Sequence, residues 1–284
     1  MRDFKGCTAL VTGSAQGIGL GIAKRLRAEG ANVFMADMQA AKVADAARTL
    51  DPSGATTASC AVDVNASASV TAMIDAAVSR FGGLHYLVNV AGGSGTTPAD
   101  SIEDMSEEIW DRVIGANLKG TYLCCRAAVP HIKKSGGGGI LNFATGSLAG
   151  AAGRSTMTAR LAYVAAKAGI VGFSNQLAMD LAEFGVSVNA IQPGFTLTEP
   201  GARIYEQFQK LSEADRAAML ARMKIPPRTP EEIAFASVAI LAQGADRLTG
   251  SVVRVAGGAL ASLDLKFTDE GLTPLGRGVR VEPQ

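Results

Sequence analysis

The feature of this sequence that most constrains its fold is a regular alternation of short apolar stretches with amphipathic segments. The apolar stretches are expected to be strands over residues 7–12, 31–37, 57–64, 84–90, 140–144, 186–192 and 251–255. Helical periodicity covers residues 17–29, 40–50, 67–81, 107–117, 120–134 and 161–184, and a further helix is expected to begin at Pro230. Continuously apolar strands separated by such helices predict an α/β fold. Its parallel sheet has about seven strands and is covered by helices on both faces.

The alternation shows neither an internal repeat nor a boundary, so we expect one catalytic domain over residues 1–263. Four consecutive glycines, residues 136–139, are expected to break the chain just before the fifth strand. Residues 195–225 form an insertion between the sixth strand and the next helix. Residues 264–284 form a polar tail that contains Gly and Pro. The tail is expected either to cross onto a neighbouring subunit or pocket, or to be a disordered terminus.

Size and charge narrow the class of function. The chain has 284 residues, enough for one large α/β domain. Its formal net charge of +1 and its lack of a basic block give no support to a nucleic-acid partner. No apolar run approaches the roughly 18 residues of a membrane span. The first residues lack a signal-peptide core. We therefore expect a cytoplasmic protein with no membrane or nucleic-acid partner.

The four cysteines, Cys7, Cys60, Cys124 and Cys125, form no Cys-x-x-Cys pair. Only two histidines are present to join them as metal ligands. We therefore expect free thiols and no bound metal.

A glycine-rich turn links the first strand to the first helix. It has the sequence Thr12-Gly13-Ser14-Ala15-Gln16-Gly17-Ile18-Gly19. Glycines in such a turn allow a tight bend, a close approach to a pyrophosphate, and close packing of helix on strand. The helix N-terminus adds unpaired N–H groups and the positive end of a dipole. We expect Gly13, Gln16, Gly17, Ile18 and Gly19 to contact the phosphates of a dinucleotide.

Asp37 ends the second expected strand. An acid at this place hydrogen-bonds the adenosine ribose hydroxyls and repels a 2′-phosphate. The next residue is Met38, and the glycine turn supplies no cation that could hold such a phosphate. The sequence therefore predicts NAD as the cofactor, in preference to NADP.

Tyr163 and Lys167 are four residues apart within an expected helix, so their side chains share one face. A free tyrosine has a pKa of about 10 and is a poor base at neutral pH. A neighbouring ammonium stabilises the phenolate and is expected to lower that pKa, which makes a usable acid/base. Alone, the pair is a weak signal, because many such pairs are solvated surface charges.

These motifs follow one another in an order that resembles the short-chain dehydrogenase/reductase family, over about residues 4–260. Asp63-Val64 resembles the pair that contacts adenine in the family. Asn89-Val90-Ala91-Gly92 resembles its Asn-Asn-Ala-Gly motif, with Val90 in place of the second Asn. The resemblance implies a Rossmann-type doubly wound sheet. It also implies cofactor contacts by Asp63, Val64, Asn89, Ala91 and Gly92.

Further positions acquire expected roles through the same resemblance. Asn117 falls at the family's structural and proton-relay asparagine. Tyr163 and Lys167 match its catalytic pair, which also contacts the cofactor. Pro193-Gly194 follows the sixth strand, and Thr196 and Thr198 stand where the family contacts the nicotinamide carboxamide.

The catalytic hydroxyl has two candidates. The family's usual spacing from the tyrosine falls on Gly150, which has no side chain. Ser147-Leu148-Ala149-Gly150 resembles the family's Ser-x-x-Gly motif and selects Ser147, whereas counting from Asn142 selects Thr145. Either hydroxyl can hydrogen-bond a substrate oxygen. On the local pattern we predict Ser147.

The resemblance implies hydride transfer between NAD and a secondary alcohol or ketone. Tyr163 would remove the hydroxyl proton, Ser147 would hold the substrate oxygen, and Asn117 would order a water molecule that returns protons to solvent. Lys167 would lower the pKa of Tyr163 and hydrogen-bond the nicotinamide ribose.

The insertion at 195–225 corresponds to the family's substrate-covering segment. Its apolar residues suit an apolar or aromatic substrate wall, or equally a pair of helices packed on their own domain. Its charges are mixed in sign and indicate no anionic substrate. The resemblance also implies a homotetramer, or a dimer.

Two other functions compete with the dehydrogenase. One is a nucleotide-sugar epimerase or dehydratase that uses bound NAD, but such enzymes generally have a different glycine spacing and a larger C-terminal domain. The other is a catalytically silent, cofactor-sensing protein, against which the Tyr163–Lys167 pair argues.

Overall fold

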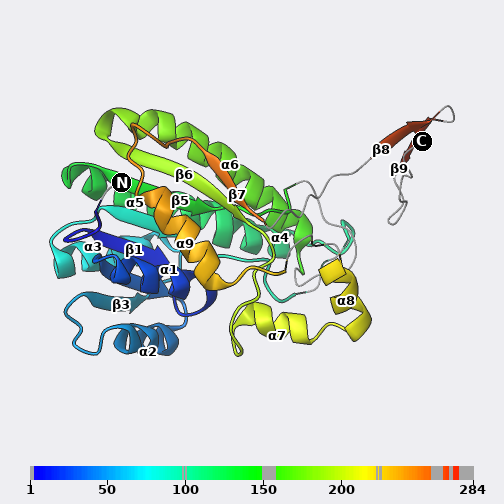
Figure 1. Ribbon diagram of the computed structural model, residues 1–284, viewed down its shortest axis with the longest axis horizontal. Helices are drawn as coiled ribbons and strands as arrows, with labels where there is room; N and C mark the ends of the chain where they lie inside the picture. Colours follow the sequence, from blue (N-terminus) through cyan, green and yellow to red (C-terminus); the bar gives the residue numbers. More distant parts are fainter. Residues whose placement is uncertain are drawn as a thin grey trace.

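The computed structural model describes residues 3–97, 99, 101–148, 158–221, 223, 226–256, 265–268 and 271–274. Its centre is a seven-stranded sheet in the order β3-β2-β1-β4-β5-β6-β7, with all neighbouring strands parallel (Figure 1). The strands are β1 (Thr8–Thr12), β2 (Asn32–Asp37), β3 (Thr57–Ala61), β4 (Tyr86–Asn89), β5 (Gly138–Phe143), β6 (Val186–Pro193) and β7 (Val252–Val255). This order confirms the expected doubly wound Rossmann-type sheet.

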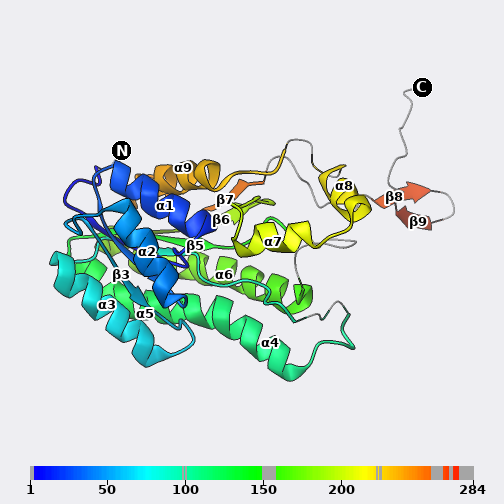
Figure 2. The ribbon, with the colours of Figure 1, turned by 90° about the horizontal axis from the view of Figure 1, so that it is seen from below.

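Helices cover both faces of the sheet. Those with buried side chains on one face are α1 (Gly17–Ala28), α2 (Ala40–Leu50) and α9 (Pro230–Leu241). The other face is covered by α3 (Ser67–Phe81), α5 (Gly120–Lys134) and α6 (Arg160–Leu181) (Figure 2). Neighbouring β1 residues alternate between the two cores, since Val11 packs on the α1 side and Leu10 on the α3 side. Each face of the sheet is therefore buried, as its continuously apolar strands require.

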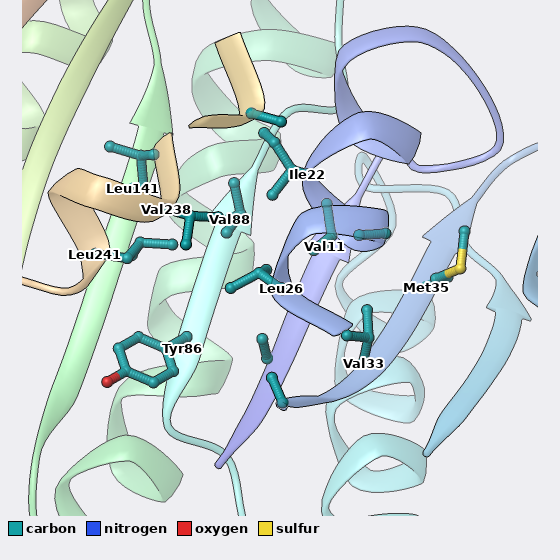
Figure 3. Close-up of a cluster of buried hydrophobic side chains, with 14 of the residues drawn as sticks. Val11, Ile22, Leu26, Val33, Met35, Tyr86, Val88, Leu141, Val238 and Leu241 are labelled. Atoms are coloured by element: carbon teal, nitrogen blue, oxygen red, sulfur yellow. The ribbon is translucent and has the colours of Figure 1, made fainter. Parts of the chain in front are cut away.

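The core on the α1 side includes side chains of α9, which is the last helix before the final strand of the main sheet. Figure 3 shows Ile22 and Leu26 of α1 beside Val11 and Val88 of the central strands, and Val238 and Leu241 come from α9. Full burial of one such side chain is worth about 1.5–3 kcal/mol. This packing fixes the N-terminus of α1 against the ends of β1 and β4, where the functional residues lie.

Three helices, α2, α3 and α5, begin and end where the sequence predicts. The start of β5 differs, because the strand begins at Gly138 and not at Ile140. A Cβ at Gly138 would lie 2.8 Å from the carbonyl carbon of His85, and its carbonyl oxygen would be nearer still. The glycine is part of the strand because β4 passes too close for a side chain. The prediction that all four glycines precede the strand is wrong.

Several further boundaries differ from expectation, and two of them bear on the site. β3 ends at Ala61, and not at Val64, because the Asp63 carboxylate accepts the N–H of Asn65 at 2.9 Å and turns the chain. The helix expected over 107–117 is α4 (Glu107–Ile114), which continues as a π-helical segment, Gly115–Lys119. Such wide turns are frequent at functional sites, and this one contains Asn117. A 3₁₀ turn, Ala182–Phe184, follows α6.

The insertion expected at 195–225 contains two helices, α7 (Arg203–Gln209) and α8 (Glu213–Ala221). They lie on the side of the sheet toward which the strands point (Figures 1 and 2). Within the tail expected at 264–284, β8 (Leu265–Thr268) and β9 (Gly271–Pro274) pair antiparallel, apart from the main sheet. Its other residues lie outside the described ranges. No helix in those ranges combines the length and apolar character that a membrane crossing needs.

The strand order places a crevice beside β1. The chain leaves β1 toward β2 and later returns to β4 on the other side of β1, so the connections diverge there. Ligands of open parallel sheets bind at this switch point, beyond the carboxyl ends of the strands.

Candidate active site

A cavity of about 800 Å³ opens at the carboxyl ends of the strands. It is lined by the segments that follow β1 to β6 and by residues of α6 and α7. The predicted site residues that line it are Gly13, Gln16, Gly17, Ile18, Gly19, Asp37, Asp63, Val64, Ala91, Gly92, Ser147, Tyr163, Lys167, Pro193, Gly194, Thr196 and Thr198. The structure therefore brings together residues from seven separate parts of the sequence pattern. Asn89 and Asn117 are the predicted residues that it places behind the lining.

The glycine turn is built for close approach of backbones. Gly13 has φ +66°, and a Cβ there would lie 2.9 Å from the backbone of Ala91. A Cβ on Gly19 would lie 2.7 Å from the carbonyl carbon of Gly13. Gly17 has φ +57°, where glycine is favoured. The turn thus presents bare backbone N–H groups at the start of α1, which is the donor set that a pyrophosphate needs.

A carboxylate already occupies part of this donor set. Glu199 Oε1 accepts the N–H of Gly17 at 2.7 Å, across the cavity from the turn's own strand. Nearby, Lys42 Nζ donates to Gln16 Oε1 and, at 3.3 Å, to the carbonyl of Gly201. An anion held at the positive end of α1 is physical evidence that this terminus binds negative charge. The sequence did not single out Glu199. The feature that could have drawn attention to it is its position directly after Thr198, a predicted cofactor contact.

Asp37 is held in place by the backbone. It is 8% exposed, and its two carboxylate oxygens accept the N–H groups of Ala15 at 3.1 Å and Gln39 at 3.0 Å. Two such bonds leave further lone pairs open toward the cavity that it lines. A fixed carboxylate beside the glycine turn suits a ribose diol. These residues therefore fit the adenosine end of a dinucleotide.

Asn117 is fully buried and holds the loop after β4. Its Oδ1 accepts the N–H of Gly93 at 3.0 Å, and its Nδ2 donates to the carbonyls of Gly93 at 2.9 Å and Val113 at 2.8 Å. A Cβ on Gly92 would lie 3.0 Å from the amide carbon of Asn117. The amide thus positions the Gly92–Gly93 wall of the cavity, and both its N–H groups are already used.

Asn89 also acts behind the wall. Its Nδ2 donates to Asn142 Oδ1 at 2.8 Å and lies 3.4 Å from Cys125 Sγ. This ties β4 to β5 and to α5, since the side chain points into the buried layer. Asn89 thus fixes the end of the strand that leads to Ala91 and Gly92, and its expected contact with the cofactor stays a prediction.

Tyr163 and Lys167 lie on one face of α6, as their spacing predicts. Lys167 is 4% exposed, its Nζ donates to the carbonyl of Phe143 at 2.6 Å, and it lies 5.6 Å from the centre of the Tyr163 ring. Burial lowers the pKa of Lys167 to about 7, and the charge of Arg203 acts in the same direction. The ammonium is therefore only partly protonated at neutral pH.

The pKa of Tyr163 corrects a prediction. Burial raises it above its ordinary value of 10.0, whereas the sequence predicts a lowered value. Two neighbours act in the lowering direction, first the guanidinium of Arg203 and then a hydrogen bond with Thr145. The desolvation of the phenolate outweighs both. The larger of the two lowering influences comes from Arg203, which the sequence did not suggest.

Among the described residues, the hydroxyl whose hydrogen bonding acts on the pKa of Tyr163 is that of Thr145. Thr145 is 7% exposed and also accepts the N–H of Ser147 at 3.2 Å. Both Thr145 and Ser147 line the cavity. Gly150, which completes the Ser-x-x-Gly pattern, lies outside the described residues. Both hydroxyls therefore remain candidates, with the interaction between Thr145 and Tyr163 in favour of Thr145.

Arg203 is a further residue of this site that the sequence did not single out. It begins α7, lines the cavity, and donates to the carbonyl of Gly92 at 3.5 Å. A Cβ on Gly93 would lie 2.7 Å from its guanidinium carbon. No pattern marked it, because only the return of the insertion over the sheet brings it to Tyr163.

The chain is similar to known proteins over most of its length. A profile of the short chain dehydrogenase family matches residues 7–209. The D-beta-hydroxybutyrate dehydrogenase of Cupriavidus necator is 36% identical over 270 residues, which cover 91% of this chain and 99% of that protein. The 2-(S)-hydroxypropyl-CoM dehydrogenase 3 of Xanthobacter autotrophicus is 37% identical over 252 residues, covering 88% and 95%. The D-threitol dehydrogenase of Mycolicibacterium smegmatis is 34% identical over 263 residues, covering 90% and 94%.

Proposed function

The chain belongs to the short-chain dehydrogenase family, and from that membership we propose that it uses NAD and a Tyr163-centred site to interconvert a secondary alcohol and a ketone. The family makes it an alcohol/ketone oxidoreductase that works with a nicotinamide cofactor. The proposal adds the choice of NAD and the residues that carry the reaction. The competing epimerase and cofactor-sensor functions are not favoured, because the relatives described above are named dehydrogenases.

The observation that carries the proposal is the cluster of half-buried Tyr163 with buried Lys167 and Thr145, in the cavity that the glycine turn also lines. When bound, the nicotinamide ring accepts or supplies the hydride. Tyr163 exchanges the proton of the substrate oxygen, as acid in reduction and as base in oxidation. Thr145 hydrogen-bonds that oxygen and stabilises the charge that develops on it.

The remaining residues orient these groups. Lys167, held by the carbonyl of Phe143, presents its Nζ on the same helical face as Tyr163. Asn117 fixes the Gly92–Gly93 wall through its amide. A water-ordering role for Asn117 stays a prediction, and it would have to use the backbone carbonyl or the remaining lone pair of Oδ1.

The preference for NAD rests on Asp37. Its fixed carboxylate suits the two ribose hydroxyls and repels a 2′-phosphate. Met38 and Gln39, which follow it and line the cavity, offer no positive charge to such a phosphate. Comparable catalytic efficiency with NADP would refute this part of the proposal.

The assembly is a further part of the proposal. Large apolar side chains are exposed on the helices α4 and α6, among them Trp110, Leu161 and Met179. We expect them to pack between subunits in a homotetramer, or in a dimer, which light scattering measures. The cytoplasmic location expected from the sequence stays a prediction.

Replacement of Tyr163 by Phe tests the proposed chemistry. NADH formation from a panel of secondary alcohols is expected to fall by at least about 100-fold, because the acid/base is removed. NAD binding, measured by calorimetry, should be retained. The control is Tyr122→Phe, which makes the same change on the exposed α5 surface. Activity retained in Tyr163→Phe would refute the assignment.

The choice of hydroxyl is tested by Thr145→Ala against Ser147→Ala. Loss of a hydrogen-bond donor to the developing oxyanion costs about 100- to 1000-fold in kcat. We expect that loss in Thr145→Ala and a much smaller one in Ser147→Ala. The reverse order would restore Ser147 as the catalytic hydroxyl.

A further inference from the structure

Arg203 enters the cavity wall as a cation without an acidic partner. The side-chain ion pairs within the described ranges involve Arg25, Arg27, Arg48, Arg228 and Arg247, and none includes Arg203. Its hydrogen bond to the carbonyl of Gly92 is long, at 3.5 Å. A guanidinium has five N–H donors. Most of this capacity is therefore available to a ligand.

Burial makes this arrangement informative. The guanidinium is close enough to Tyr163 and Lys167 for its charge to act on both, and desolvation lowers its own pKa. Holding an unpaired cation in a desolvated place is costly. An arginine in full contact with water has no such desolvation penalty. The penalty at Arg203 would be offset by an anionic ligand that binds beside the reacting residues.

The charges of the cavity lining are divided between its two ends. The charged lining residues are Asp37, Asp63, Arg112, Lys167 and Arg203. The two acids follow β2 and β3, on one side of β1, at the proposed adenosine end. The basic residues come from α4, α6 and α7. Among them, the charge of Arg203 acts on Tyr163, and Lys167 lies beside the Tyr163 ring. In the described lining, the basic residues are therefore separate from the acids, and Arg203 gives the reacting end a positive charge, which favours a negatively charged ligand.

Apolar residues surround the same end. Ile204 follows Arg203 in α7, Met219 comes from α8, and Phe195 packs on Phe208 with ring centres 5.5 Å apart. Such apolar side chains suit contact with the hydrocarbon part of a substrate and not with a charged group. The wall combines a short apolar surface with one fixed cation.

We propose that Arg203 binds a carboxylate of the substrate, so that the enzyme acts on short hydroxy acids and oxo acids in preference to neutral alcohols. The planar guanidinium matches a carboxylate with two parallel hydrogen bonds. With its acid group held there, the substrate places its carbinol carbon toward Tyr163. This inference rests on the proposed function and names its substrate class, and it replaces the expectation from the sequence that no anionic substrate is indicated.

Binding of a carboxylate that cannot react tests the site apart from the chemistry. Calorimetry with NAD present would compare butyrate with butanamide, its neutral analogue, on the wild type and on Arg203→Gln. We expect butyrate to bind about 10- to 100-fold more weakly to Arg203→Gln, the loss of a charge-assisted pair. Butanamide should bind equally to both. Arg203→Lys should restore part of the affinity. Lys210→Gln removes an exposed positive charge from the end of the same helix and should change nothing.

Turnover gives the second measurement. Two hydroxy acids, 3-hydroxybutyrate and 4-hydroxypentanoate, are each compared with the corresponding methyl ester as substrates. The ratio of catalytic efficiencies, acid over ester, should fall about 10- to 100-fold in Arg203→Gln.

Several outcomes would overturn the proposal. Butyrate binding that is absent from the wild type, or unchanged in Arg203→Gln, overturns it. An equal loss of turnover for acids and esters, or an equal loss in Lys210→Gln, also overturns it. If Arg203→Gln weakens the binding of NAD as much as that of butyrate, Arg203 belongs to the cofactor site, and the proposal is also overturned. If butyrate binding depends on Arg203 but no alcohol yields NADH, the carboxylate site stands and the proposed function fails.

Discussion

Replacement of Gly19 by alanine tests how tightly the glycine turn is packed. A Cβ at Gly19 would lie 2.7 Å from the carbonyl carbon of Gly13 and 2.9 Å from Cα of Ser14, and all these atoms belong to the backbone. Ordinary contacts of a Cβ begin at about 3.4 Å, so the turn must open by roughly 1 Å. Overpacking of this kind typically costs about 1–3 kcal/mol.

The matched control is Gly172→Ala in α6. A Cβ at Gly172 would meet nothing within 4 Å, so alanine there should stabilise the helix by about 1 kcal/mol. The free energies of unfolding of the two variants should therefore differ by about 2–4 kcal/mol, which corresponds to about 4–16 °C in Tm. Thermal unfolding followed by circular dichroism measures the difference.

A measurement of NAD binding distinguishes a local distortion of the glycine turn from a general loss of stability. Gly19→Ala displaces the N–H groups at the start of α1, so its Kd for NAD, measured by calorimetry well below its Tm, should rise. Gly172→Ala should bind NAD as the wild type does. A Gly19→Ala protein as stable as Gly172→Ala would refute the reasoning, because the backbone contact would then carry no free energy.

Three carboxylates give further predictions, each from its own contacts. Glu199→Gln should bind NAD about 3- to 10-fold more tightly, because a neutral amide competes less well than a carboxylate for the Gly17 N–H; an unchanged or higher Kd contradicts this competition. Asp37→Asn should lose about 10- to 100-fold in kcat/KM with NAD and gain with NADP, in steady-state assays with both cofactors; an unaltered ratio contradicts the ribose contact. Hydrogen bonds from Ser53 and Thr56 hold the pKa of Asp51 well below its ordinary 3.8. The ionised Asp51 carboxylate thus contributes fully to the stability of the folded state above about pH 4, and this contribution is lost as pH falls below that value. Asp51→Asn should therefore lower Tm at pH 7 and lower it progressively less in acid, and an equal loss at pH 7 and pH 3 would refute the assignment.

The sequence predicts those parts of the fold that depend on local pattern. Helices α2, α3 and α5 have clear periodicity and matching breaks, so their ends agree with expectation. The start of β5 was missed because Gly138 is there to let β4 pass close by, which is a contact between distant segments. The π-helical turn at Gly115–Lys119 was missed for a similar reason, since its distinguishing contact joins Asn117 to Gly93.

The candidate site divides in the same way. Motif residues such as Asp37 and Tyr163 follow strands or share a helix face, so topology alone brings them to one edge of the sheet. Arg203 carries no motif and reaches the cavity only because the insertion folds back over the strand ends. The choice between Thr145 and Ser147 also needed coordinates, because two reasonable counts along the chain gave different residues.

The raised pKa of Tyr163 also bears on how each direction of the reaction depends on pH. Burial raises its pKa above the ordinary value of 10.0, so at neutral pH the phenol holds its proton. A protonated Tyr163 is an acid, and it protonates the oxygen of a ketone as reduction proceeds. The opposing influence of Arg203 depends on its free charge. A carboxylate bound to Arg203 would neutralise that charge, so the pKa of Tyr163 would rise further. The two proposals together therefore point to an enzyme that reduces oxo acids at neutral pH and oxidises hydroxy acids best in alkaline solution.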